Sequence, residues 1–132
     1  MSAVGAGEIE RVFREEYGRA VARHLAQYDI GQTVVVAESA CVAVEAMEGT
    51  DATIERAATL SNARRLVVVK ISKPEQDMRF DVPVVGRRTI EVMSRCHASV
   101  LAIDAGKTLL FERHELMEEA NRAGIAVVAV KD

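Results

Sequence analysis

Apolar residues recur at helical spacing in the first part of the chain. Between residues 8 and 27 they fall every three or four positions, while arginines and glutamates occupy the other face. This periodicity predicts an amphipathic surface helix over residues 8–27. The small residues that precede it lead us to expect a flexible N-terminus over residues 1–7.

The next segment changes from helical periodicity to two short β-rich runs. TVVVA (residues 33–37) and CVAVEA (residues 41–46) are separated by a short polar step, which predicts a β-hairpin. The sequence Glu-Gly-Thr-Asp then interrupts the apolar pattern. We expect Thr50 or Asp51 to cap a helix that continues to about residue 60.

Three apolar runs of strand length follow, and each is typical of a strand buried on both faces. They are LVVVKI, SVLAID and IAVVAV, at residues 66–71, 99–104 and 125–130. Helices are expected over residues 87–96 and 113–123, a short strand over 108–111, and a helix C-cap at Gly124. The alternation of strands and helices along the chain predicts an α/β fold. We expect a three-layer-like sandwich with a mixed, largely parallel sheet, helices packed on it and a β-hairpin addition.

The composition suits one compact domain. The chain has 132 residues, 49% of them apolar, so a continuous core can form and we expect residues 8–132 to be a single α/β domain. The net charge of −3 gives no indication of nucleic-acid binding. Cys41 and Cys96 lie far apart in the sequence, so we expect both to be reduced thiols. No signal peptide or membrane span is evident, so we expect a cytoplasmic protein with at most peripheral membrane contact.

A long polar segment, KISKPEQDMRFDVPVVG, runs from Lys70 to Gly86. Two prolines bracket EQDMRFDV and disfavour a helix there. If this part is extended, Asp77, Arg79 and Asp81 point to one side and the apolar residues between them to the other. The segment therefore predicts two carboxylates and a guanidinium standing together above the core.

Such a group of side chains suits a phosphate-bearing ligand. Paired carboxylates can hold a hard cation such as Mg²⁺, or one of them can act as a general base. Arginine makes bidentate phosphate contacts. Lys70 leaves the end of a buried strand and Lys73 follows it, which is where ligands bind in open α/β sheets. The competing interpretation is a solvated loop with ordinary surface ion pairs.

EAMEGTD, from Glu45 to Asp51, is the second candidate. It precedes a helix whose free N–H groups can receive an anion, although a strand end followed by a capped helix is the favoured explanation. AGKT is not a phosphate-binding loop, because Leu101 stands where the Walker pattern needs glycine. The three histidines are isolated, and we expect them on the surface.

Four segments, taken in order, match a known pattern. They are YDIGQTVVVAE, VAVEAMEGTDATIERA, VVVKISKPEQDMRFDVPVVGRRTIEVM and SVLAIDAGKTLLFERHELMEEANRAGIAVV. In order and spacing they resemble the C-terminal domain of the UDP-2,3-diacylglucosamine pyrophosphatases of bacterial lipid A synthesis. The resemblance runs from about residue 29 to residue 130, and the block K-P-x-Q-D-x-R-F-D-x-P-x-x-G is its most specific part.

The resemblance implies a metal-dependent hydrolase that splits the pyrophosphate of UDP-2,3-diacylglucosamine into UMP and 2,3-diacylglucosamine 1-phosphate. It matches Asp77 to the catalytic aspartate, which would bind Mg²⁺ (or Mn²⁺) and help to place the attacking water, with Asp81 as the alternative. The residues that it implies for phosphate or substrate binding are Lys70, Lys73, Gln76, Arg79, Glu45, Thr50 and Asp51.

The chain also departs from the family pattern. Glu75 stands where the family usually has glycine, and Arg87 lies near the position of a family proline. Family enzymes carry an N-terminal domain before this one, and the substrate is expected between the two. We therefore expect a missing N-terminal domain as partner and a UDP-diacyl-sugar as substrate, with homo-oligomers possible. The alternatives are a non-catalytic module that binds a nucleotide or phosphosugar or docks on another domain, and a scaffold whose loop charges are structural.

Overall fold

The computed structural model describes residues 6–28, 30–38, 40–61, 65–72, 84–106 and 108–130. The helices are α1 (Ala6–Gln27), α2 (Thr50–Leu60), α3 (Arg87–Arg95) and α4 (Arg113–Ala123). The strands are β1 (Thr33–Ala37), β2 (Ala40–Val44), β3 (Leu66–Lys70), β4 (Val84–Val85), β5 (Ala98–Asp104), β6 (Leu109–Leu110) and β7 (Ala126–Val130).

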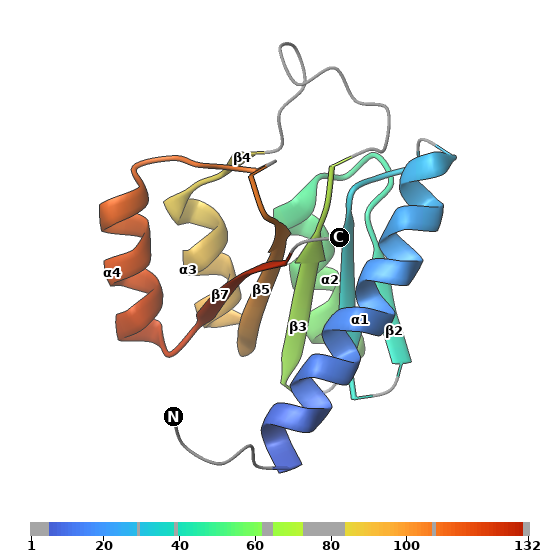
Figure 1. The fold of residues 1–132 in the computed structure, drawn as a ribbon, viewed down its shortest axis with the longest axis horizontal. Coiled ribbons are helices and arrows are strands. Elements are labelled where there is room, and N and C mark those ends of the chain that lie inside the picture. Colours follow the sequence, from blue (N-terminus) through green and yellow to red (C-terminus); the bar gives the residue numbers. More distant parts are fainter. Residues whose placement is uncertain are drawn as a thin grey trace.

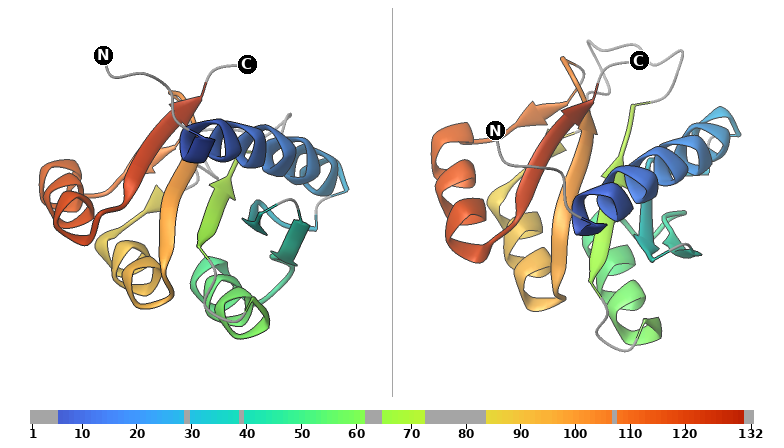
Figure 2. Two further views of the ribbon diagram at one scale, coloured as in Figure 1. Left: turned by 90° about the horizontal axis from the view of Figure 1, so that it is seen from below. Right: turned by 60° about the horizontal axis from the view of Figure 1, so that its bottom comes forward.

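The described strands form a five-stranded sheet in the order β2-β1-β3-β5-β7 and a separate two-stranded ladder, β4-β6. Strands β3, β5 and β7 are parallel, whereas β1 is antiparallel to both β2 and β3. Helix α1 lies on one face of the sheet, and α2, α3 and α4 lie on the other (Figures 1 and 2). The prediction of a sandwich with a mixed, largely parallel sheet and an added hairpin is confirmed.

Two apolar clusters fill the spaces between these layers. Alternation along β3 explains both, since Leu66 and Val68 face α2, α3 and α4 while Val67 and Val69 face α1. All four side chains are fully buried, as the unbroken apolar run predicted. Gly18 lets α1 approach this sheet closely, because a Cβ there would lie 2.7 Å from a methyl group of Val69.

The local predictions agree closely with the observed elements, with some shifts at the ends. Helix α1 begins at Ala6, two residues earlier than predicted. Helix α4 has its predicted bounds, and Gly124 follows in the left-handed conformation at φ 72°. The predicted cap of α2 is wrong: Gly49 is the N-cap, and Thr50 is already the first helical residue. The reason is that the Thr50 hydroxyl bonds to Thr33 rather than to its own helix.

The strand β4 was not predicted. Its two residues pair with Leu109 and Leu110 of β6, and the Phe111 N–H donates to the Val85 carbonyl at 2.9 Å. This small ladder closes one end of the fold beside the main sheet (Figure 1). Among the helices that the structure describes, none combines the length and apolar character needed to cross a membrane.

Candidate functional site

The carboxyl ends of β3 and β5 and the N-terminal ends of α2 and α3 meet at one edge of the sheet (Figure 1). The connectivity demands this, because each helix starts where a strand or its loop leaves that edge. In open α/β sheets this edge is where ligands bind. The polar side chains gathered here form what we call the edge cluster: Thr33, Glu45, Thr50, Asp51, Lys70, Ser72, Arg88, Thr89 and Asp104.

Lys70 is the basic centre of the edge cluster. It is the last residue of β3 and is partly buried. Its Nζ donates a hydrogen bond to the Val84 carbonyl at 3.1 Å. Burial lowers the pKa of the Lys70 ammonium, while the nearby carboxylates of Glu45 and Asp51 act in the opposite direction. An anionic ligand at this edge would stabilise the charged form further.

Glu45 is held by a chain of hydrogen bonds that reaches the start of α2. Its Oε1 accepts the Gln32 N–H at 3.1 Å, and its Oε2 accepts the Thr50 hydroxyl at 3.5 Å. The Thr50 and Thr33 hydroxyl oxygens lie 3.1 Å apart. Gly31 makes this close turn possible, because a Cβ there would lie 2.0 Å from the Glu45 carbonyl oxygen. Glu45 and Thr50 therefore join β1, β2 and α2.

Asp51 joins the first turns of α2 and α3. Its Oδ1 accepts the Thr89 hydroxyl at 3.0 Å, and its Oδ2 lies 3.5 Å from the Arg88 Nε. Arg88 is largely exposed, with 85% of its side-chain surface accessible, so this ion pair is screened by solvent. The hydrogen bond from Thr89 is the interaction that fixes the Asp51 side chain.

Asp104 ends β5 as a buried carboxylate, with 8% of the residue exposed. Its Oδ2 accepts two hydrogen bonds from Ser72, from the backbone N–H at 3.1 Å and from the hydroxyl at 3.3 Å. Its Oδ1 lies 3.7 Å from a guanidinium nitrogen of Arg19 on α1. The carboxylate thus ties the chain just beyond β3 to β5.

The structure brings together four of the residues singled out from the sequence: Glu45, Thr50, Asp51 and Lys70. The other five lie outside the described residues: Lys73, Gln76, Asp77, Arg79 and Asp81. Sequence reasoning missed Thr33, Ser72, Arg88, Thr89 and Asp104. Only Asp104 carried a clear signal, because it is a carboxylate at the end of a buried strand.

A metal ion does not fit the described side chains of the edge cluster. Within the described ranges, no three or more His, Cys, Asp or Glu side chains converge in a way that could hold one. Glu45 and Asp51 already accept hydrogen bonds from Gln32, Thr50 and Thr89.

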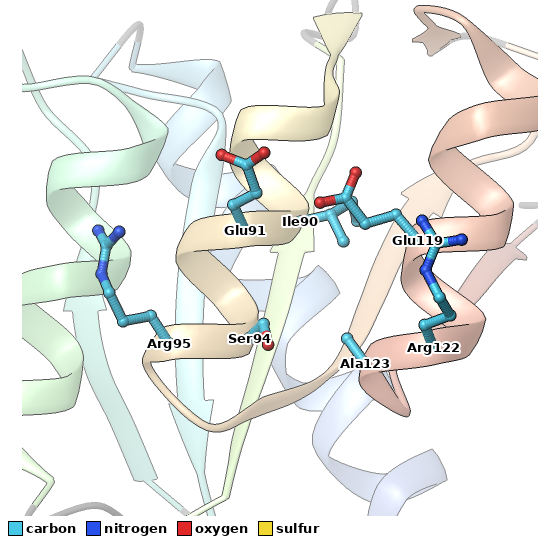
Figure 3. Close-up of a pocket in the computed structure, with 7 residues that line it drawn as sticks. All are labelled: Ile90, Glu91, Ser94, Arg95, Glu119, Arg122 and Ala123. Atoms are coloured by element: carbon cyan, nitrogen blue, oxygen red, sulfur yellow. The ribbon is translucent and has the colours of Figure 1, made fainter.

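Two grooves lie on the helical layer, beside α3. One, of about 410 Å³, separates α3 from α4 (Figure 3). Its lining residues are Ile90, Glu91, Ser94, Arg95, Glu119, Arg122 and Ala123. The other, of about 490 Å³, follows the outer face of α3. Charged residues line both grooves, and some of them form ion pairs, such as Arg87–Glu119 at 2.9 Å. Of the residues that line the two grooves, only Arg88 also belongs to the edge cluster. The grooves are thus largely separate from that cluster.

Comparison with known proteins gives two matches. Residues 8–128 match the family model described as the LpxI C-terminal domain. Over 117 residues the chain is 39% identical to the UDP-2,3-diacylglucosamine pyrophosphatase LpxI of Caulobacter vibrioides, a match that covers 83% of this chain and 42% of the relative. The chain thus spans less than half the length of the curated relative.

Proposed function

Because this chain belongs to the family of LpxI C-terminal domains, we propose that it supplies one half of a UDP-2,3-diacylglucosamine pyrophosphatase of lipid A biosynthesis. The reaction is hydrolysis of the diphosphate, giving UMP and 2,3-diacylglucosamine 1-phosphate. Since the relative is more than twice as long as the matched part, the active unit also needs an N-terminal domain. The observation that carries the proposal is the position of Lys70 at the end of β3, beside the start of α2.

The diphosphate would bind at the N-terminal end of α2. The first N–H groups of a helix have no partner within the helix and favour anions. Gly49, the N-cap of α2, offers no side chain to occupy them, and no side-chain capping bond is seen among the described residues. The Lys70 ammonium supplies a positive charge at the same edge. Its desolvation makes contact with an anion more favourable than at an exposed lysine.

Segment 73–83 supplies the remaining groups in this proposal. Lys73, Gln76 and Arg79 bind phosphate oxygens, and Asp77 holds Mg²⁺ (or Mn²⁺) and helps to place the attacking water, with Asp81 as the alternative. A divalent cation neutralises the charge on the diphosphate oxygens. The described residues that flank this segment both contact the edge cluster: Ser72 donates to Asp104, and the Val84 carbonyl accepts from Lys70.

Release of UMP tests the proposal. The chain is mixed with the N-terminal part of the Caulobacter vibrioides relative and with UDP-2,3-diacylglucosamine, and UMP is measured by chromatography. We expect release that requires Mg²⁺ and falls by about 100-fold or more in Asp77→Ala, which is the usual contribution of a positioned carboxylate. Equal rates for Asp77→Ala and the wild type would remove Asp77 from the catalytic machinery. Asp81→Ala tests the alternative in the same assay.

A second candidate function is a module that binds a nucleotide or phosphosugar without hydrolysing it. The observation that favours it is the N-terminus of α2, which has no side-chain capping bond among the described residues and has the Lys70 ammonium at the same edge, so a phosphate could bind there without being hydrolysed. Calorimetry of the chain with UMP and Mg²⁺, alongside the UMP-release assay, separates the two functions. Heat of binding without UMP release indicates the module. A millimolar dissociation constant corresponds to a binding free energy of about −4 kcal/mol. If millimolar UMP gives no heat, the chain has no UMP site that works without another domain.

A further inference from the structure

Strand β7 has the sequence of a central strand but lies at the edge of the sheet. Its residues, AVVAV, are all apolar, and such an unbroken run is typical of a parallel strand covered on both sides. Among the strands that the structure describes, β7 has β5 as its one neighbour. Val127 and Val128 are only partly buried and Ala129 is exposed, whereas Val67 and Val68 of β3 are fully buried. The apolar run of β7 is thus incompletely covered.

The opposite edge strand, β2, is protected against further pairing. The Glu45 N–H donates to Thr33 at the start of β1, so the Val44 carbonyl of the same trans peptide points away from β1. Arg56 of α2 donates to this carbonyl at 2.8 Å. The pairing of β2 with β1 also skips Val42, which forms a bulge. Bulges and charged side chains are the devices by which natural edge strands avoid pairing with other chains.

Strand β7 carries neither of these devices in the part of the chain that the structure describes. Its pairing with β5 is regular, and its five residues include no charge and no proline. The sequence is also complementary to itself. If two copies pair antiparallel about a two-fold axis at Val128, each Val127 lies opposite the partner's Ala129. Large and small residues then meet and no like charges oppose each other, as an interface made of one surface and its own copy requires.

Helix α4 continues this apolar edge. It is the outermost helix on the same side of the molecule (Figure 1). Glu119 of α4 faces α3, where it pairs with Arg87. Met117 lies two residues earlier, which is about 200° around the helix, and therefore on the side away from α3. Met117 and Val127 are both partly buried and pack against the same core cluster. A second copy paired along β7 would cover both side chains.

We propose that β7 and the adjoining side of α4 form an interface between two copies of this chain. The two β7 strands pair antiparallel, and the two five-stranded sheets join into one continuous sheet. Pairing satisfies the outward N–H and C=O groups of each β7, and burial of the partly exposed valines provides the apolar driving force. Because β7 is parallel to β3 and β5, the edge clusters of the two copies face in opposite directions.

Sedimentation equilibrium of the 132-residue chain, from about 10 μM to about 1 mM, tests this interface. Ala129→Lys places a charge on the exposed edge of β7. Its matched control is Ala40→Lys, the same change at an exposed alanine of β2, and circular dichroism verifies that both variants fold. Val128→Cys locates the axis, because residues directly opposite in an antiparallel pair lie within reach of a disulfide. The wild type, with Cys41 and Cys96, is the control for oxidation.

We expect the mass of the wild type and of Ala40→Lys to approach twice the 14.4 kDa of one chain. Ala129→Lys should dimerise at least about 10-fold more weakly, because the lysines of both copies lie near the axis. Oxidation should link Val128→Cys, but not the wild type, into dimers.

A wild type that stays monomeric at about 1 mM, or Val128→Cys that does not cross-link, would overturn the proposal. So would a dimer that Ala129→Lys leaves unchanged, or that Ala40→Lys weakens equally. A monomeric chain whose Val127 amide resonance shifts only when the relative's N-terminal part is added would assign this edge to that domain instead.

Discussion

Gly31 controls the position of Glu45, and replacing it with alanine is the sharpest structural perturbation of the edge cluster. A Cβ at this position would lie 2.0 Å from the Glu45 carbonyl oxygen, whereas ordinary contact begins at 3.4 Å. One backbone must therefore move by more than about 1 Å. The movement strains the bond from the Glu45 N–H to the Thr33 carbonyl, 2.9 Å, and the bond from the Gln32 N–H to Glu45, 3.1 Å.

Overpacking and weakened hydrogen bonds together set the expected loss of stability in Gly31→Ala. Overpacking costs about 1–3 kcal/mol, and each weakened hydrogen bond about 1 kcal/mol. We expect the free energy of unfolding to fall by about 3–5 kcal/mol in urea denaturation followed by circular dichroism. Gly86→Ala is the matched control, because a Cβ at Gly86 would have no atom within 4 Å; it should change by less than about 1 kcal/mol. Equal stability of both variants would show that the close approach of Gly31 to the Glu45 carbonyl does not limit what residue 31 can be.

Three further changes have definite expected outcomes. Thr89→Val removes the hydroxyl bonded to Asp51 and should lower the free energy of unfolding by about 1 kcal/mol. The control is Thr59→Val, which removes a hydroxyl bonded within α2 and should change this free energy by less than about 0.5 kcal/mol. Equal losses in the two variants would contradict a stabilising role for the Thr89–Asp51 bond. The pKa of Lys70 is lowered in the folded state, so between the folded pKa and the unfolded pKa of about 10.4 the unfolded chain binds more protons than the folded one. The contribution of Lys70 to the free energy of unfolding therefore rises with pH across this window and is lost as pH falls through the folded pKa. Urea denaturation at a series of alkaline pH values should show the wild type gaining on Lys70→Met by at most about 1.4 kcal/mol per pH unit, and a flat difference would contradict the shift. Leu101→Ala empties a fully buried position and should cost about 2–5 kcal/mol in the same denaturation assay; a loss below about 1 kcal/mol would contradict the packing of the core.

The fold was predictable where local pattern and burial agree. The unbroken apolar run of β3 indicated a strand covered on both faces, and Gly124 marked the end of α4. The β4–β6 ladder was not predictable, because it joins two-residue strands more than 20 residues apart. The predicted cap of α2 was wrong for a similar reason: the partners of the Thr50 hydroxyl, Thr33 and Glu45, lie outside that helix.

The edge cluster was predictable only in part. Lys70 and Asp51 stand at a strand end and a helix start, and such positions are visible in a sequence. Thr89 and Ser72 were missed because nothing in the neighbouring sequence shows their carboxylate partners, which come from elements far away in the chain. The roles given to the residues of segment 73–83 stay predictions.

Binding of an anion at the edge cluster can be followed residue by residue by nuclear magnetic resonance. An isotope-labelled chain is titrated with UMP and Mg²⁺ to millimolar concentration, and backbone amide shifts are followed. We predict the largest shifts at Thr50, Asp51 and Lys70, with little change at Ser94 and Arg122 in the groove between α3 and α4. Shifts concentrated in that groove, or none at millimolar ligand, would contradict binding at the edge cluster.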